Sequence, residues 1–427
     1  NGGVARGGEA RMTVSKDMAA PARSDYDPLT GGEENDKAYC SEYSLPDEPT
    51  AADYLSYPYR VAEYFLSGIL HHFGWQFAIM TACTYIGVKG LLLSILGQVR
   101  LSFCKKTLGI DGTACQTLGT IAGTPWAIKG AIGVISDMYP LFGWHKASYI
   151  AVVGVLGSVA FFSLAAFPIA SAGAAGFFLL VGNLQIATTD LLMEGQYAGK
   201  MAAKPQTGSM MVSFVWGCFQ IGSLIAACFV GPMVDAFDPK IVFWFCLPLS
   251  MLILVPNALG YVGDEKVPDE RRGIDWKLYN SNKLIIIFCL IVAACAVVNA
   301  LIDLLFFDAH LAQMLYALAC TVLLSVLAFL WLPPELAKCN FYMFLSCVLY
   351  VNIGSAQDYW FTADGACVPG GPGFDYTYYN TYTAIVGAFT GWVGIVLFQA
   401  TMTNWPFRKL FWVTTLLQVV ASAFDML

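Results

Sequence analysis

The sequence predicts an all-α polytopic membrane protein. Of its 427 residues, 57% are hydrophobic and only 12% are charged, and the mean hydropathy is +0.60. Soluble domains carry about 25% charged residues, so a water-soluble enzyme of this length would lack the surface it needs. The hydrophobic content also excludes a disordered chain, and 13 cysteines are too few for a disulfide scaffold.

A polar, acidic segment comes first, and we expect residues 1–68 to form a disordered cytoplasmic tail. Apolar runs of about 20 residues follow, each long enough to cross about 30 Å of hydrocarbon as a helix. The expected spans are 76–98, 115–136, 147–170, 174–195, 209–234, 241–262, 284–305, 310–332, 341–357, 379–400 and 408–427.

The hydrophilic segment 263–283 separates the first six spans from the rest. We interpret it as a cytoplasmic linker that follows an N-terminal six-helix bundle, residues 69–262. The chain stops at Leu427 inside an apolar run, which favours a fragment whose C-terminal bundle, 341–427, is incomplete.

Lysine and arginine in the short loops favour a cytoplasmic N-terminus. The inside loops then hold Lys146, Lys200, Lys204, Lys266, Arg271, Arg272, Lys277, Lys283, Lys338, Arg408 and Lys409. The outside loops hold only Arg100, Lys105, Lys106 and Lys240, three of them in the first loop.

Four charged residues fall inside the expected spans: Lys89, Lys129, Asp190 and Glu194. Facing lipid, each would cost about 2.5–3.5 kcal/mol at the bilayer centre, so each should face a bundle interior or an aqueous cavity. Asp190 and Glu194 are four residues apart and share a helix face.

Lys129 and Asp190 lie about 10 Å and about 9 Å above the inner ends of their spans, at about 1.5 Å per residue. This matching depth predicts that they are partners. Lys89 falls near the midplane, and no acidic partner is evident for it in the sequence. It therefore suits an anionic ligand or a proton relay, whereas static ion pairs that fix helix register are the alternative for all four.

The segment 119–149 reads GTIAGTPWAIKGAIGVISDMYPLFGWHKASY. It resembles the signature of the folate–biopterin transporter family, a branch of the major facilitator superfamily, and DLLMEGQYAG and VSFVWGCFQIG agree further along the chain. Gly130 replaces the usual proline after the signature lysine, and the basic cluster is thinned to His145 and Lys146. The matching signature residues are Pro125, Trp126, Lys129, Gly133, Ser136, Asp137, Pro140, Gly143, Trp144 and Lys146.

The resemblance implies a two-bundle, major-facilitator-like transporter in which residues 284–332 form two additional helices, with about three more spans beyond Leu427. It also implies that the turn containing Ser136, Asp137 and Lys146, with Glu194 near the same face, belongs to a cytoplasmic gate. In the related superfamily motif, such an acidic and basic pair clamps the inner helix ends across the two bundles.

The cargo implied is folate, biopterin or a related pterin, moved by coupling to protons in the plasma membrane. A pterin ring can stack on Trp126 or Trp216, and glutamate carboxylates can meet Lys89 or Lys129. Asp190 can accept hydrogen bonds from the pterin or carry the coupled proton. Helix packing is the plainer role for the two tryptophans. Alternatives are an S-adenosylmethionine carrier of the same family and a transporter-fold pterin sensor.

Enzyme, cofactor, metal and nucleic-acid roles are not expected. No GxSxG or HExxH motif occurs, and GQYAGKM lacks the spacing of a phosphate-binding loop. The four histidines lack metal-ligand spacing. Cys104 and Cys115 flank the first outside loop, and either a bridge between them or two free thiols fits the sequence.

Overall fold

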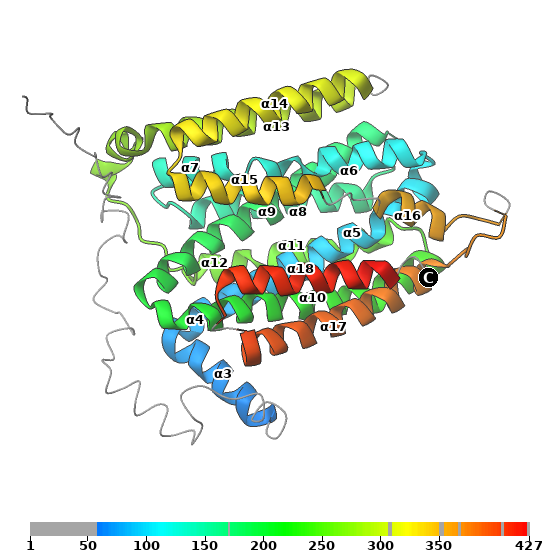
Figure 1. The fold of residues 1–427 in the computed structure, drawn as a ribbon, viewed down its shortest axis with the longest axis horizontal. Coiled ribbons are helices and arrows are strands. Elements are labelled where there is room, and N and C mark those ends of the chain that lie inside the picture. The colour runs from blue at the N-terminus through cyan, green and yellow to red at the C-terminus, as the bar shows by residue number, and fades with distance from the viewer. Residues whose placement is uncertain are drawn as a thin grey trace, which may run out of the picture.

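The computed structural model describes residues 58–169, 171–305, 310–349, 354–365, 369–402 and 405–424. Within these ranges every extended regular element is a helix, and the one isolated bridge joins Leu141 and Trp144. Nine helical segments of the described chain are long and apolar enough to cross a membrane. The all-α polytopic fold is therefore confirmed (Figure 1).

The first half of the order, with π- and 3₁₀-helical pieces labelled η, is α3 (Pro58–Phe73), α4 (Trp75–Ala82), η3 (Cys83–Leu92), α5 (Leu93–Ser102), η4 (Phe103–Leu108), α6 (Gly112–Ala127), α7 (Lys129–Met138), α8 (Ala147–Ala166), α9 (Ala172–Ala203), η5 (Pro205–Thr207), α10 (Gly208–Ala236), α11 (Ile241–Leu252) and α12 (Leu254–Ala258). The remainder is η6 (Asp269–Arg271), α13 (Trp276–Leu305), α14 (His310–Trp331), α15 (Pro334–Leu349), α16 (Gly354–Phe361), η7 (Thr377–Tyr382), α17 (Thr383–Leu397), η8 (Phe398–Met402) and α18 (Phe407–Phe424).

The end of the expected disordered tail is helical. Residues 1–57 lie outside the described ranges, but α3 already begins at Pro58. Phe65, Ile69 and Phe73 recur every four residues on one face of α3 and pack into the core. An amphipathic stripe thus makes residues 58–68 a helix, where overall polarity predicted none.

The core lies among the first six spans. The largest fully buried side chains include Tyr85, Leu92, Phe161 and Phe243, which come from η3, α8 and α11. Small residues bring helices into contact: a Cβ on Gly222 of α10 would lie 2.8 Å from the Cα of Gly90 in η3. This close approach holds the segment that carries Lys89 against α10.

The expected linker 263–283 is partly helical, because α13 already begins at Trp276. The part before it lies on the α7–α8 connection, where Val267 N donates to Gly143 O at 2.8 Å and Asp275 N donates to Met138 O at 2.9 Å. α13 then packs on α6 and α7, and α14 packs on α13. α13 and α14 therefore cover one side of the first six spans (Figure 1).

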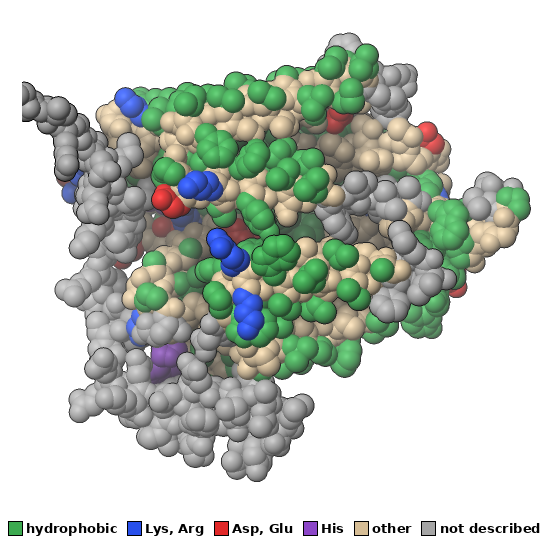
Figure 2. All heavy atoms as spheres, viewed as in Figure 1, with side chains coloured by type: hydrophobic (Ala, Val, Ile, Leu, Met, Phe, Trp, Pro, Cys, Tyr) green, Lys and Arg blue, Asp and Glu red, His purple; other side chains and the backbone are tan. Residues whose placement is uncertain are grey.

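The later helices lie on the outside of the first bundle. α17 and η7 pack along α10, and α16 contacts α6. Figure 2 shows hydrophobic side chains spread along α14, α15 and α17, and many of them, such as Val322, Phe389 and Val386, are exposed. Exposed apolar surface of this extent suits lipid or further helices. α15, with 16 residues, and α18, with 18, are not among the nine membrane-length segments, so the expected spans 341–357 and 408–427 stay predictions.

Candidate functional site

Lys89 lies inside a π-helical stretch in the middle of the first span. The helix runs continuously from Trp75 to Leu108, and η3 supplies its residues 83–92. π-Helical turns widen the helix locally and are frequent at functional sites. Only 14% of the Lys89 side chain is exposed.

A break in the second span positions Lys129. Pro125 lies inside α6, where it lacks an N–H and disturbs the helical hydrogen bonds. Ile128 then leaves the helical region, with φ −93° and ψ 5°, and Lys129 is the first residue of α7. Across the break, Trp126 and Lys129 both bond to α9, Trp126 to Asn183 and Lys129 to Asp190.

Asp190 joins both lysines. Its Oδ1 accepts a hydrogen bond from Lys89 Nζ at 2.9 Å, and its Oδ2 accepts one from Lys129 Nζ at 2.5 Å. Glu194, one turn further along α9, lies 3.9 Å from Lys89 Nζ and 3.6 Å from Lys129 Nζ. Asp190 is fully buried, whereas 40% of the Glu194 side chain is exposed.

These distances confirm that Lys129 and Asp190 are partners and that Asp190 and Glu194 share a face. The expectation that Lys89 lacks an acidic partner is wrong. Depth along a helix gives no rotation about its axis, and α9 turns Asp190 toward both lysines at once. Two ammonium groups and two carboxylates leave this cluster without formal net charge, which lowers the cost of burying it.

Aromatic rings surround the cluster. Lys129 Nζ lies 4.6 Å from the Trp126 ring centroid, and Lys89 Nζ lies 5.4 Å and 5.5 Å from those of Tyr85 and Trp216. These are cation–π distances. Trp126 Nε1 also donates to Asn183 Oδ1 at 3.3 Å. Both predicted tryptophans thus border the cluster, and Trp216 is half exposed.

The predicted gate residues lie together at one end of α7 and α8, which we call the motif end, with the exception of Glu194, which lies beside Lys89 and Lys129. Lys146 forms an ion pair with Asp137 and donates to Ser136 Oγ at 3.2 Å. Ser136 Oγ donates to Gly133 O at 2.8 Å. The turn between the helices is closed by Gly143 N, which donates to Pro140 O at 3.2 Å.

This turn binds the segment after α12. Asp264 Oδ2 accepts hydrogen bonds from the backbone N–H groups of Lys146, at 2.6 Å, and Ala147, at 3.0 Å, so it caps the start of α8. Sequence reasoning missed Asp264, because its bonds cross more than 110 residues. A clamp across two bundles was implied by the resemblance. In the described residues, the Asp137–Lys146 pair lies within one helix connection.

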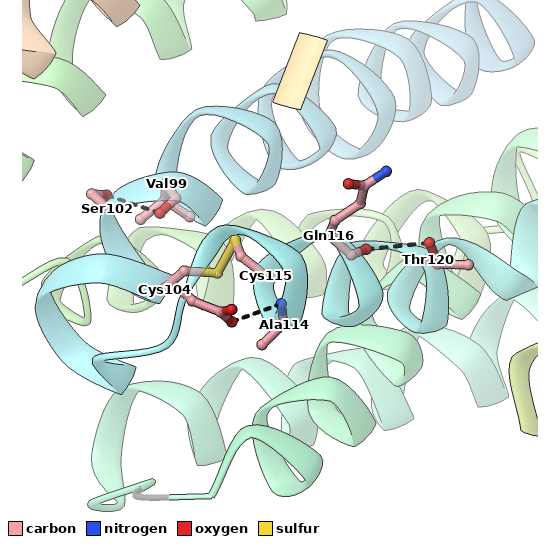
Figure 3. The surroundings of a disulfide bond; sticks show 8 residues. Val99, Ser102, Cys104, Ala114, Cys115, Gln116 and Thr120 are labelled. Carbon is pink, nitrogen blue, oxygen red and sulfur yellow. Dashed lines mark hydrogen bonds between the residues drawn. A yellow bond between two sulfur atoms is a disulfide. The ribbon is translucent and has the colours of Figure 1, made fainter. Parts of the chain in front are cut away.

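The opposite end, which we call the disulfide end, carries a Cys104–Cys115 bridge. It joins η4 to the first turn of α6, where Asp111 caps the helix by accepting from Ala114 N at 3.0 Å (Figure 3). Of the two possibilities for these cysteines, the structure contains the bridge. No group of three potential metal ligands occurs among the described residues.

Comparison with known proteins gives a consistent family. The model described as the BT1 family matches residues 89–427. The folate-biopterin transporter of Synechocystis sp. is 31% identical over 154 residues, which are 35% of this chain and 31% of that protein. Probable folate-biopterin transporters 2 and 5 of Arabidopsis thaliana are 25% and 22% identical over 85% and 83% of this chain. The chain spans 62% of the length of each Arabidopsis relative. All three relatives are named as transporters.

Proposed function

This chain belongs to the BT1 family, and on that premise we propose that it carries folate, biopterin or a related pterin across a membrane. The observation that carries the proposal is Asp190, a fully buried carboxylate bonded to Lys89 and Lys129 in the middle of membrane-length helices. Ionised groups at such depth are costly and mark substrate or proton pathways. The names of the relatives supply the cargo class.

The cluster suits an anion with a flat ring. Lys89 and Lys129 can bind a carboxylate of folate through charge-assisted hydrogen bonds. The ring system can stack on Trp216, whose face is half exposed, or on Trp126. Each tryptophan ring lies within 5.5 Å of one of the two ammonium groups, so ring and carboxylate can be held by neighbouring side chains.

The charges of the cluster support a proposal of coupling to protons. Asp190 occupies both lysines, so a substrate carboxylate has to compete with it. A proton on Asp190 removes its charge and frees the ammonium groups for the incoming anion. One proton and one carboxylate enter together, and the cluster keeps its net charge near zero. We therefore propose proton symport, with Asp190 as the proton carrier and Glu194 as a half-exposed group on the route to the motif end.

The remaining proposals concern architecture and placement. We propose two bundles that rock about the cluster, with α13 and α14 as additional helices and the Asp137–Lys146 turn as part of the cytoplasmic gate. Disulfides persist in oxidising compartments, so the Cys104–Cys115 end faces outward. The lysine and arginine distribution agrees. The N-terminus then lies in the cytoplasm, and the plasma membrane is the proposed location.

Uptake into proteoliposomes tests the function. The whole protein is reconstituted, a proton gradient is imposed, and accumulation of radiolabelled folate and biopterin is followed with and without a protonophore. For folate, whose carboxylate competes with Asp190, we expect concentrative uptake that the protonophore abolishes. S-adenosylmethionine is run in parallel, because the half-exposed Glu194 carboxylate can bind a cation. Saturable pterin binding with no uptake would instead support a sensor.

A further inference from the structure

The disulfide end holds a polar cluster that joins parts of the chain far apart in sequence. Lys106 Nζ donates to Val234 O at 2.7 Å and lies 3.9 Å from Asp235 Oδ1. Asp235 Oδ2 accepts from the backbone N–H of Thr377 at 2.7 Å and from its hydroxyl at 2.6 Å. Thr377 is the first residue of η7, so the carboxylate caps that helix and ties it to α10.

Lys105, also in η4, makes a second link. Its Nζ donates to Thr362 Oγ1, just after α16, at 2.9 Å, and lies 4.5 Å from the ring centroid of Tyr359 within α16. Lys106 Nζ lies 5.0 Å from the ring of Tyr376. Burial, aided by Tyr359 and Asp235, raises the pKa of Tyr376 to about 12, so this ring stays neutral and its face attracts the ammonium group.

These contacts explain an exception in the charge distribution. Lys105 and Lys106, expected in an outside loop where few positive charges occur, lie in η4 at the end of the first span. Lys105 is bound to Thr362, in the later part of the chain. Lys106 is bound to α10 through Val234 and Asp235, and its contact with the later part is the Tyr376 ring. The Cys104–Cys115 bridge ties η4, which carries both lysines, to the first turn of α6 (Figure 3).

On α9, burial increases from the motif end toward this end: the Glu194 side chain is 40% exposed, whereas Asp190 and Asn183 are buried. The ion pair between η4 and α10 is partly exposed, with 39% and 30% of the Lys106 and Asp235 side chains accessible. Such pairs contribute little individually and can break and reform, as a reversible closure requires.

We propose that Lys105, Lys106, Asp235, Thr362 and Thr377 form a latch that closes the disulfide end of the transport path. The latch has to release before the Lys89–Asp190 cluster can be reached from that side. This inference rests on the proposed transport function for its purpose, but the closure itself is a property of the fold that can be measured without substrate.

Chemical labelling at Thr381→Cys measures the closure. Thr381 is 5% exposed. Its hydroxyl packs so closely on Gly231 of α10 that a Cβ added to this glycine would lie 2.3 Å from it. The whole protein is treated with a membrane-impermeant maleimide, and the rate at position 381 is read by peptide mass spectrometry, which separates it from the native thiols. In the Asp235→Ala background we expect labelling about tenfold faster, the change that about 1.4 kcal/mol of lost closure produces.

Asp238→Ala is the matched control. Asp238 lies at the same end of α10, but its contacts are with Thr107 and Lys240, within the first part of the chain. We expect its labelling rate to equal that of the parent. Lys106→Gln, a milder variant should Asp235→Ala fold poorly, should also accelerate labelling. Equal rates in Asp235→Ala, Lys106→Gln and Asp238→Ala would overturn the latch.

The outcome separates the latch from the transport proposal. If Asp235→Ala is labelled faster but the parent takes up no pterin, the latch is supported and the proposed cargo is refuted. If the parent takes up pterin but labelling is unchanged in both latch variants, the transport function is supported and the latch is refuted.

Discussion

Lys89 donates a 2.9 Å hydrogen bond to Asp190, although 101 residues separate them in the chain. The bond crosses from the π-helical part of the first span to the middle of α9. Lys129 binds the other oxygen of the same carboxylate. One buried side chain therefore holds three membrane spans together, and it does so in a cluster that contains equal numbers of positive and negative groups.

Removing the charge of Asp190 should destabilise the protein strongly. Asp190→Asn leaves two buried ammonium groups with only the half-exposed Glu194, and we expect the free energy of unfolding to fall by about 3–5 kcal/mol. Glu194→Gln, at longer distances and in contact with solvent, should cost less than about 1 kcal/mol. Thermal unfolding in detergent, followed by size-exclusion chromatography, compares them. Equal losses would contradict the central role of Asp190.

Lys89 should distinguish cargo that bears carboxylates from cargo that does not. A charged hydrogen bond contributes about 1.5–3 kcal/mol, so Lys89→Gln should weaken folate binding by about tenfold or more. Biopterin has no carboxylate and should lose much less. Lys240→Gln is the control, because Lys240 donates to Phe167 O and has no bond to the Lys89–Asp190 cluster among the described contacts. A uniform loss for folate and biopterin in Lys89→Gln would argue for a purely structural lysine.

Gly143 should not tolerate a side chain. Its φ is +86°, and an added Cβ would lie 2.9 Å from Arg272 Nε. Gly143→Ala should lower stability by about 1–2 kcal/mol and loosen the turn that holds Asp137 and Lys146. Gly199→Ala, inside α9 with nothing within 4 Å of the new Cβ, should instead be neutral or stabilising. Protease nicking of the 139–146 turn in intact membranes reports the loosening, and unchanged nicking in Gly143→Ala would refute it.

The Cys104–Cys115 bridge should report membrane orientation. A membrane-impermeant reductant should open it only when added to the face opposite the N-terminus, because disulfides form on the oxidising side. Replacing both cysteines by serine should cost about 2–4 kcal/mol in unfolding free energy. An N-terminal epitope supplies the reference for sidedness in sealed vesicles. Reduction from the epitope's own side would reverse the proposed topology.

The agreement between sequence and structure is best where the physics is local. Apolar runs of membrane length predicted the nine described spans, and helical spacing placed Asp190 and Glu194 on one face. Depth along two spans that run in the same direction also matched Lys129 with Asp190. The amphipathic start at Pro58 was hidden by the polarity of the surrounding residues, although the four-residue spacing of Phe65, Ile69 and Phe73 was a signal that could have revealed it.

By itself, the sequence determined that this chain forms membrane-length helices and which charged side chains lie within them. Hydropathy and helical rise suffice for this, because both depend only on neighbours along the chain. The tertiary structure alone decided that Lys89 shares Asp190 with Lys129, that Asp264 caps α8, and that Asp235 binds both Lys106 and η7. These choices depend on how each helix is rotated about its axis and which helix lies beside it. That rotation is set by packing among residues a hundred or more positions apart, such as Gly90 against Gly222.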